Sequence, residues 1–305
     1  MMTTFVLDGG AGRLITAIPA LEKYARLNPE DDFRVLTAAW EELYWAHPVL
    51  QNRTFNINQK GTFDLHMRHR RLVHPEPYML NDYYNQRIHL TDAFDREINQ
   101  TTDHTDLDKP NLYITQEETH RARYLLNAHR KSQNKQRVIV IQPYGSGISI
   151  QNGRPSDATH RSLDVDFYLQ MAYRLNKHSV VVFLGNKEFQ HPGDSYSVNL
   201  FDHDPNLRLY MSIISECDYF IGVDSVGQHI ARAFNKPGTI ILGSTFEQNV
   251  SYADHFKIYR NKYPPTYTPI RISSVDCDMA NNLNDKTMQF DDDDLKSIMG
   301  EFYER

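Results

Sequence analysis

Short apolar runs alternate with segments whose apolar residues recur at helical spacing along most of the chain. Six runs have the length of strands buried on both faces of a parallel sheet. They span residues 4–8, 33–37, 137–142, 179–185, 219–223 and 238–243. Amphipathic segments that predict helices follow most of them, at 13–27, 164–178, 204–218 and 226–235. This alternation predicts an α/β fold with parallel sheets.

The pattern repeats in two halves, and 305 residues are enough for two domains with separate cores. Thr115 and Glu118 have the spacing of a capping box, so a helix is expected to begin there and to connect the halves. We therefore predict an N-terminal Rossmann-like domain over 1–130 and a C-terminal one over 131–290. The last helix, 291–305, is a candidate to pack back on the first domain.

Composition and charge exclude several classes of protein. The net charge of −6 excludes a globally basic surface for DNA. The two cysteines, Cys217 and Cys277, provide neither a disulfide framework nor a thiolate metal site. The longest apolar runs are too short to span a bilayer, and no signal-peptide core fits the first residues. These features predict a soluble, cytoplasmic protein.

Residues that carry chemistry gather where the fifth apolar run meets the helix that follows it. Ligands of parallel α/β sheets bind at the carboxyl ends of the strands. The turn there contains Asp224, Ser225, Gly227, Gln228 and His229. A helix N-terminus suits an anion such as a diphosphate, the hydroxyl, amide and imidazole groups would add donors, and the glycine would let a ligand approach the backbone. The alternative is that Asp224 and Ser225 cap the helix and His229 is structural.

This turn and the segments around it resemble the family 9 glycosyltransferases, the ADP-heptose:lipopolysaccharide heptosyltransferases. That family ends a strand with Asp-(Ser/Thr)-Gly-x-x-His, then continues with an alanine-rich helix, a proline, a strand and Gly-x-Thr. Here the same order reads GVDSVGQHIARAFNKPGTIILGST, with Thr245 on the pattern and Val226 where the family has glycine. The loop with Gly145 and Ser146 resembles the family's nucleotide-facing loop. Arg161 takes the place of a family lysine and keeps its charge.

The resemblance implies a GT-B fold, in which two doubly wound Rossmann-like domains enclose a cleft. It implies an inverting, metal-independent transferase, without a cofactor, that moves a sugar from a nucleotide-diphosphate sugar to an acceptor hydroxyl. The acceptor, a saccharide or a lipopolysaccharide-type glycan, would lie on the N-terminal domain. The donor would bind the C-terminal domain through Gly145, Ser146, Arg161, Asp224, Ser225, Gly227, Gln228, His229 and Thr245.

The expected catalytic base is the main departure from the family pattern. The family places a carboxylate directly after the N-terminal glycine turn, but Arg13 stands there and cannot act as a base. Asp8, at the end of the first strand, is the nearest carboxylate that could take the acceptor's proton, although closing the strand and bonding the glycine turn explains it equally well. Arg13 would instead bind an acidic acceptor or the donor phosphates. A nucleotide-sugar-binding protein that has lost catalysis is therefore a second hypothesis.

The region of about residues 50–110 resembles the family only weakly and leaves the acceptor open. The basic stretch 66–71 is followed by His74, with Tyr83 and Tyr84 nearby. Cations for phosphates and aromatic rings for bases would suit a modified DNA base as acceptor. A solvated polar face explains the same stretch without a ligand.

Overall fold

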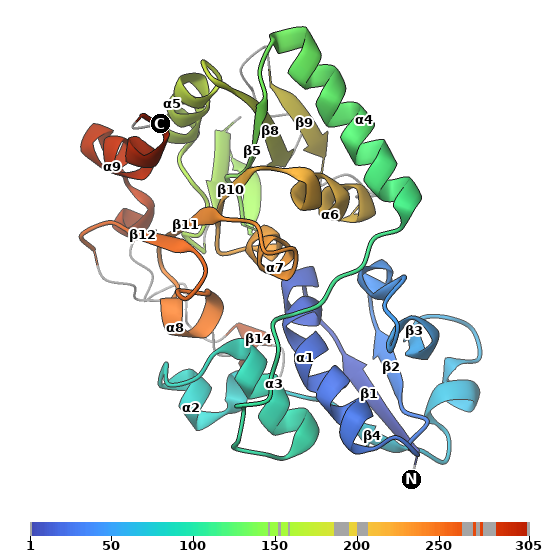
Figure 1. Cartoon of the computed structure of the whole chain (residues 1–305). Coiled ribbons are helices and arrows are strands. Elements are labelled where there is room, and N and C mark those ends of the chain that lie inside the picture. The colour runs from blue at the N-terminus through green and yellow to red at the C-terminus, as the bar shows by residue number, and fades with distance from the viewer. Residues whose placement is uncertain are drawn as a thin grey trace.

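The computed structural model describes residues 2–145, 147–151, 154–157, 159–185, 195–199, 207–263, 271–272, 275–276 and 285–303. These residues form two α/β units, one below the other in Figure 1, each built on a parallel sheet. The predicted fold class, two Rossmann-like domains, is therefore confirmed. No helix in the described part of the chain is long and apolar enough to cross a membrane.

The N-terminal domain is built on four parallel strands in the order β3-β2-β1-β4. They are β1 (Thr3–Leu7), β2 (Arg34–Thr37), β3 (Thr54–Asn56) and β4 (Arg71–Val73). The long helix α1 (Ala11–Leu27) packs against α3 (Leu90–Asn99). The remaining elements are short: η1 (Glu41–Tyr44), η2 (Gln51–Arg53), η3 (Phe63–Met67), η4 (Pro77–Met79) and α2 (Asn81–Tyr84). Strands of three residues carry too little pattern to be predicted, so β3 and β4 went unassigned in the sequence.

The C-terminal domain is built on six parallel strands in the order β12-β11-β10-β5-β8-β9. They are β5 (Arg137–Gln142), β8 (Ser179–Gly185), β9 (Tyr196–Asn199), β10 (Tyr219–Val223), β11 (Gly238–Leu242) and β12 (Lys257–Arg260). Helices α5 (Val165–Leu175), α6 (Leu207–Glu216), α7 (Val226–Ala233) and α8 (Glu247–Val250) connect them, and β6 (Ile148–Gln151) pairs with β7 (Arg154–Asp157) in a hairpin. A second pair, β13 (Arg271–Ile272) with β14 (Val275–Asp276), follows β12, and η6 (Asp285–Met288) precedes the last helix. The four apolar runs predicted in this half are all strands of one sheet.

The connecting helix α4 (Gln116–Gln133) belongs by its packing to the upper domain. Thr115 and Glu118 form the predicted capping box. Ala122 and Leu126 are buried, and the helix runs along α6 in Figure 1. We therefore propose that the domain boundary lies before α4 rather than at residue 130, because this helix packs against α6 of the C-terminal domain.

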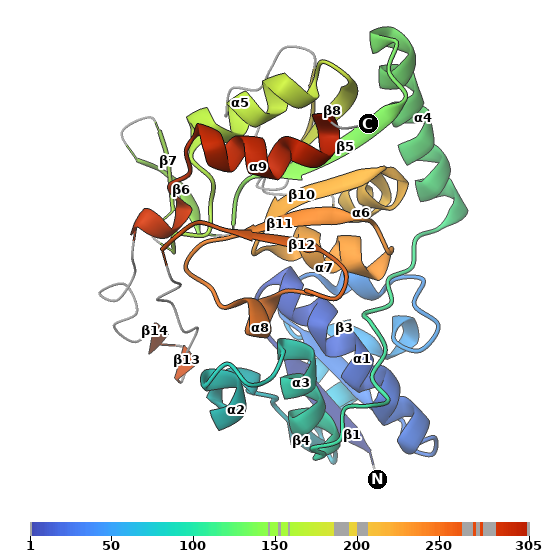
Figure 2. The same cartoon turned by 60° about the vertical axis from the view of Figure 1, so that its left-hand side comes forward.

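The last helix, α9 (Asp292–Tyr303), also belongs to the upper domain. Figure 2 shows it beside α5 on one face of the six-stranded sheet. Leu295, Ile298 and Met299 are buried in the same cluster as residues of α5 and β8. The expectation that this helix packs back on the first domain is wrong, since its apolar stripe is buried within the second.

The two domains meet through the N-terminal ends of α1 and α7. Gly12 opens α1, and a β-carbon there would lie 3.0 Å from Cδ2 of His229 in α7. Each helix directly follows the carboxyl end of a central strand, β1 or β10. The carboxyl edges of the two sheets therefore face the same junction, which is where this class of fold binds its ligands.

Candidate functional site

The first turn of α7 is held by a side chain that the sequence analysis overlooked. Gln142 ends β5, and its Oε1 accepts the backbone N–H of Gly227 at 2.9 Å. Its Nε2 donates to Oγ of Ser225 at 2.8 Å. Ser225 makes no side-chain cap of its own, so neither it nor Asp224 closes the helix as the alternative interpretation held. One of the N–H groups expected to meet a diphosphate is therefore already bonded.

Gly227 serves packing and not the approach of a ligand. A β-carbon at this position would lie 2.2 Å from Oε1 of Gln142 and 2.7 Å from Cζ of Phe220. The residue is buried and faces β5 and β10, away from the junction. The role predicted for it is corrected, because the missing side chain is needed to seat α7 on the sheet.

Gln228 and His229 are buried inside the C-terminal domain and its contact with α1. Gln228 is fully buried, and its Nε2 donates to Oδ1 of Asp224 at 3.0 Å. His229 places Nδ1 2.9 Å from the hydroxyl of Tyr252. Burial, with the nearby charge of His89, lowers the pKa of His229 to about 3, so the ring is neutral at physiological pH. A neutral ring would not meet the donor diphosphate as a cation, and the burial of His229 with its contact to Tyr252 favours the structural interpretation.

Asp224 is the centre of a charged cluster at the carboxyl end of β10. Its Oδ2 lies 3.8 Å from Nη1 of Arg161, and Arg260, at the end of β12, is close enough for the two charges to interact. Burial raises the pKa of Asp224, while Arg161, Thr245 and Arg260 favour the ionised form. Arg260 in turn donates to the carbonyl oxygen of Thr245 at 2.9 Å. Three of the predicted donor-binding residues, Arg161, Asp224 and Thr245, are thus brought together.

The loop after β5 is tied to the segment that carries Arg161. The backbone N–H of Gly145 donates to Oγ of Ser162 at 2.9 Å, and that hydroxyl donates to Asp157 at 2.5 Å. Nε of Arg161 donates to the hydroxyl of Thr159 at 3.0 Å. These bonds fix the direction of the guanidinium toward Asp224. Ser146, also predicted here, lies outside the described residues.

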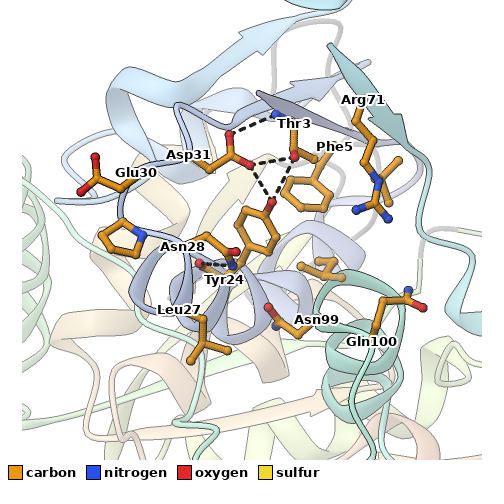
Figure 3. A pocket seen from close by; sticks show the side chains of 13 residues that line it. Thr3, Phe5, Tyr24, Leu27, Asn28, Glu30, Asp31, Arg71, Asn99 and Gln100 are labelled. Atoms are coloured by element: carbon orange, nitrogen blue, oxygen red, sulfur yellow. Dashed lines mark hydrogen bonds between the residues drawn. The ribbon is translucent and has the colours of Figure 1, made fainter. Parts of the chain in front are cut away.

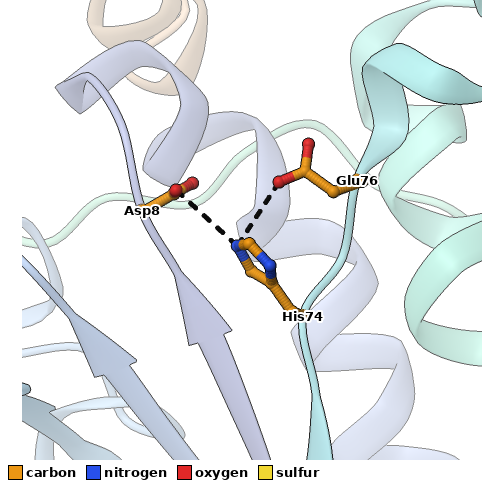
Figure 4. Close-up of side chains that lie close together, drawn as sticks. All are labelled: Asp8, His74 and Glu76. Atoms are coloured by element: carbon orange, nitrogen blue, oxygen red, sulfur yellow. Dashed lines mark ion pairs between the residues drawn. The ribbon is translucent and has the colours of Figure 1, made fainter. Parts of the chain in front are cut away.

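On the N-terminal side, three acid–base groups converge at the carboxyl ends of β1 and β4. Figure 4 shows Asp8, His74 and Glu76 with the imidazole between the two carboxylates. Nε2 of His74 lies 3.6 Å from Oδ2 of Asp8 and 3.3 Å from Oε1 of Glu76. Asp8 and Glu76 also pair with Arg13, at 3.0 and 3.4 Å. Both faces of the junction therefore carry charged groups.

Arg13 is buried within the N-terminal domain and does not face a ligand. Only 3% of its side chain is exposed. Its Nη2 donates to the carbonyl oxygen of Pro75 at 2.6 Å, and its guanidinium lies over the rings of Tyr78 and Phe94. The expected roles of Arg13 in binding an acidic acceptor or the donor phosphates are therefore wrong. Its charge is used inside the protein, where it holds Asp8 in place.

The comparisons with known proteins rest on structure. No family model and no curated protein matches this sequence. Among solved structures, a family 9 glycosyl transferase from Veillonella parvula superposes with a TM-score of 0.65 at 12% identity, covering 86% of this chain and 88% of that one. The E. coli ADP-heptose LPS heptosyltransferase II gives 0.66 at 12% identity, covering 99% of this chain and 100% of its own. This chain has the fold of the family 9 glycosyltransferases.

A third structure with this fold bears on metal binding. The iron-containing dodecameric glycosyltransferase TibC from enterotoxigenic E. coli gives a TM-score of 0.62 at 11% identity, covering 100% of this chain and 78% of that one. In our chain, Asp8, His74 and Glu76 each offer a ligand atom, and these atoms lie within 4.8 Å of one another. The guanidinium of Arg13 pairs with both carboxylates and offsets one of their two negative charges, which weakens the attraction of the cluster for a metal ion. We therefore treat these three residues as an acid–base cluster.

A cavity lies at the opposite edge of the N-terminal sheet. It has a volume of about 610 Å³ and lies at the amino ends of β1 and β4. Figure 3 shows the hydroxyls of Thr3 and Tyr24 meeting the carboxylate of Asp31 in its wall. Ligands of this fold bind at the carboxyl edge, so the cavity is separate from the site described above.

The basic stretch proposed for nucleic acid is largely bonded within the protein. Arg70 donates to Oγ1 of Thr4 at 2.9 Å, and Arg68 pairs with Asp64 at 2.7 Å. His66 is buried and stacks on Phe55 at 3.8 Å between ring centroids. A surface for polyanions needs free cations, so the DNA acceptor loses its support here.

Several site residues were missed by sequence reasoning, for different reasons. Gln142 and Arg260 end strands that carry no motif, although a polar residue at the carboxyl end of a buried strand is itself a usable signal. His74 and Glu76 lie between residues 52 and 108, where the sequence predicted no helix or strand. Their relation to Asp8 depends on the pairing of β4 with β1, which short strands do not reveal in sequence.

Proposed function

We propose that this protein is a glycosyltransferase that moves a sugar from a nucleotide-diphosphate donor to a hydroxyl of a glycan acceptor. We propose further that it inverts the anomeric centre and needs no metal. The main support for this proposal is the cluster of Arg161, Arg260 and Asp224 at the carboxyl edge of the C-terminal sheet, in a chain with the fold of the family 9 glycosyltransferases.

On the donor side, the two arginines supply most of the attraction for the diphosphate. About a fifth of each side chain is exposed, 22% for Arg161 and 23% for Arg260, so both can meet a ligand while partly desolvated. Ser225 accepts from Gln142 and keeps its own hydrogen for a phosphate oxygen. The dipole of α7 adds roughly 0.3–1 kcal/mol, which alone is too little for tight binding. Fixed cations at the leaving diphosphate would stabilise the charge that develops there.

On the acceptor side, the N-terminal domain presents His74, Asp8 and Glu76 toward the same junction. In an inverting displacement the acceptor oxygen attacks the anomeric carbon from the face opposite the leaving diphosphate. The acceptor hydroxyl must lose its proton in that step, so an acid–base group is required on this side. A glycan acceptor stays our proposal, and so does a cytoplasmic location.

Turnover of donors tests the proposal. The protein is incubated with a panel of nucleotide-diphosphate sugars and glycan acceptors, and the release of free nucleoside diphosphate is measured. We expect release with at least one donor, dependent on an acceptor and unaffected by a chelator. No release and no binding for any donor would remove the proposal. Binding without transfer to any acceptor would support the second hypothesis, an inactive nucleotide-sugar-binding protein.

A further inference from the structure

The imidazole of His74 is oriented by carboxylates from two different segments. Asp8 comes from the end of β1 and Glu76 from the segment that follows β4, and both face Nε2. Carboxylates accept hydrogen bonds, so this position favours the tautomer with its hydrogen on Nε2. In the neutral ring Nδ1 then keeps its lone pair. The side chain is 49% exposed, and among the described residues no hydrogen bond occupies Nδ1.

The charges behind this arrangement hold it in place. Arg13 of α1 pairs with Asp8 and Glu76 from the buried side. The backbone N–H of Glu76 donates to Glu97 of α3 at 3.4 Å. Asp8 and Glu76 thus face His74 directly, while Arg13 and Glu97 contact these two acidic residues. Oδ1 of Asp8 faces Arg13 and Oδ2 faces His74, so both oxygens of this carboxylate lie against charged or titratable groups of the protein.

We infer that His74 is the catalytic base that takes the proton of the acceptor hydroxyl, with Asp8 and Glu76 as positioning residues. This inference rests on the proposed transferase function. It replaces the sequence-based prediction that Asp8 is the base. A base whose second ring nitrogen is held by a carboxylate is a recurring solution to proton transfer, because the carboxylate fixes both the tautomer and the direction of the ring.

The chemical step balances without another reactant. Nδ1 of His74 takes the proton of the acceptor hydroxyl, and the oxygen uses the electron pair that remains to form its bond to the anomeric carbon. The bond between that carbon and the diphosphate oxygen breaks, and its electron pair leaves with the nucleoside diphosphate. The imidazolium, stabilised by Asp8 and Glu76, then releases the proton to solvent. The products are the glycosylated acceptor, the nucleoside diphosphate and one proton.

The test compares His74→Ala and His74→Gln with His120→Ala, a control that removes an exposed histidine from α4. We expect kcat to fall about a hundred- to ten-thousandfold in both His74 variants, the usual contribution of a general base. The affinity for the donor should stay within about twofold, because the donor site lies on the other domain. Added imidazole should restore part of kcat in His74→Ala. If His74 is the base, kcat of the wild type should fall at acidic pH, because a protonated ring cannot take a proton. The residual rate of His74→Gln should not show this fall.

Three results would overturn the inference. One is a kcat within about twofold of the wild type in both His74 variants. Another is a loss of donor affinity that accounts for the whole loss of turnover. The third is a wild-type kcat abolished by a chelator and restored by a divalent ion, which would make the cluster a metal site. A wild type that transfers no sugar is a different result, since it removes the proposed function and this inference with it.

Discussion

Replacing Asp224 by asparagine should stabilise the protein at neutral pH while weakening its function. Asp224 is 8% exposed, and its carboxylate accepts a hydrogen bond from Gln228 at 3.0 Å. Its nearest guanidinium nitrogen, on Arg161, is 3.8 Å away, which is too long for a hydrogen bond. At that distance the attraction is about 4 kcal/mol at an effective dielectric constant near 20. Removing the carboxylate from water costs several kcal/mol.

The raised pKa of Asp224 shows that burial outweighs these attractions. The sign of the pH dependence follows directly. When an acid has a raised pKa in the folded state, the protein loses stability as pH rises from the unfolded pKa of that acid, about 3.9, to its folded value. Above that value the loss is complete. Asparagine has nearly the same shape, can accept the same hydrogen bond and does not ionise, so it removes this loss.

Thermal unfolding followed by circular dichroism at pH 4 and pH 7 measures the effect. We expect Asp224→Asn to gain roughly 1 kcal/mol at pH 7, the size usual at a destabilised functional position, and almost nothing at pH 4. The melting temperature should rise by about 2–4 °C at pH 7. Turnover should fall in the same variant, whereas the exposed control Asp292→Asn should change neither quantity. A variant that is less stable than the wild type at pH 7 would refute the reasoning, because the ion pair would then outweigh burial.

Two further predictions concern the turn that begins α7. His229→Gln keeps a hydrogen-bonding group but does not titrate. Because the folded pKa of His229 is about 3, the free energy of unfolding of the wild type should fall relative to that of the variant, by up to about 1.4 kcal/mol per pH unit, as pH falls from 6.5. Urea unfolding at pH 7 and pH 5 measures this difference. An equal difference at both pH values would contradict it. Gly227→Ala should destabilise by roughly 1–3 kcal/mol, since its β-carbon would overlap Gln142 and Phe220. Gly300→Ala, in open space on α9, should leave the melting temperature nearly unchanged, and equal melting temperatures for the two alanine variants would contradict the packing role.

The sequence predicted the fold well where its pattern was long and apolar. Each of the four apolar runs in the second half became a strand of one parallel sheet, because a strand of five to seven residues covered on both faces must be apolar throughout. Strands as short as β3 and β4, with three residues each, are stabilised by their neighbours and leave no such pattern. The boundary that we propose before α4 could not be read from the sequence, because the sequence of α4 shows which face is apolar but not which domain covers it.

The candidate site was predicted less well, because a residue type does not reveal which way a side chain points. Asp224 and Arg161 lie together as expected, since both stand at the ends of recognisable segments, and their role in donor binding stays a prediction. His229 was assigned to the ligand, although the structure buries it against Tyr252 and the first turn of α1. Arg13 was assigned to a substrate, although tertiary packing buries it between aromatic rings. Gln142 illustrates the reverse error, because it lies in a plain apolar strand and still closes the first turn of α7.

The most direct test of the proposed donor site is calorimetric binding of a nucleoside diphosphate and of its parent nucleoside. Arg161→Ala is compared with Arg174→Ala, a control of similar exposure (22% and 27%) whose partner is Asp292 on the far side of the domain. Removing one charge-assisted hydrogen bond costs about 1.5–3 kcal/mol, or roughly ten- to a hundredfold in affinity. We predict that loss for the nucleoside diphosphate with Arg161→Ala, no loss for the nucleoside, and no change with Arg174→Ala. Equal affinity of the wild type for both ligands, or an undiminished affinity of Arg161→Ala for the diphosphate, would contradict the account.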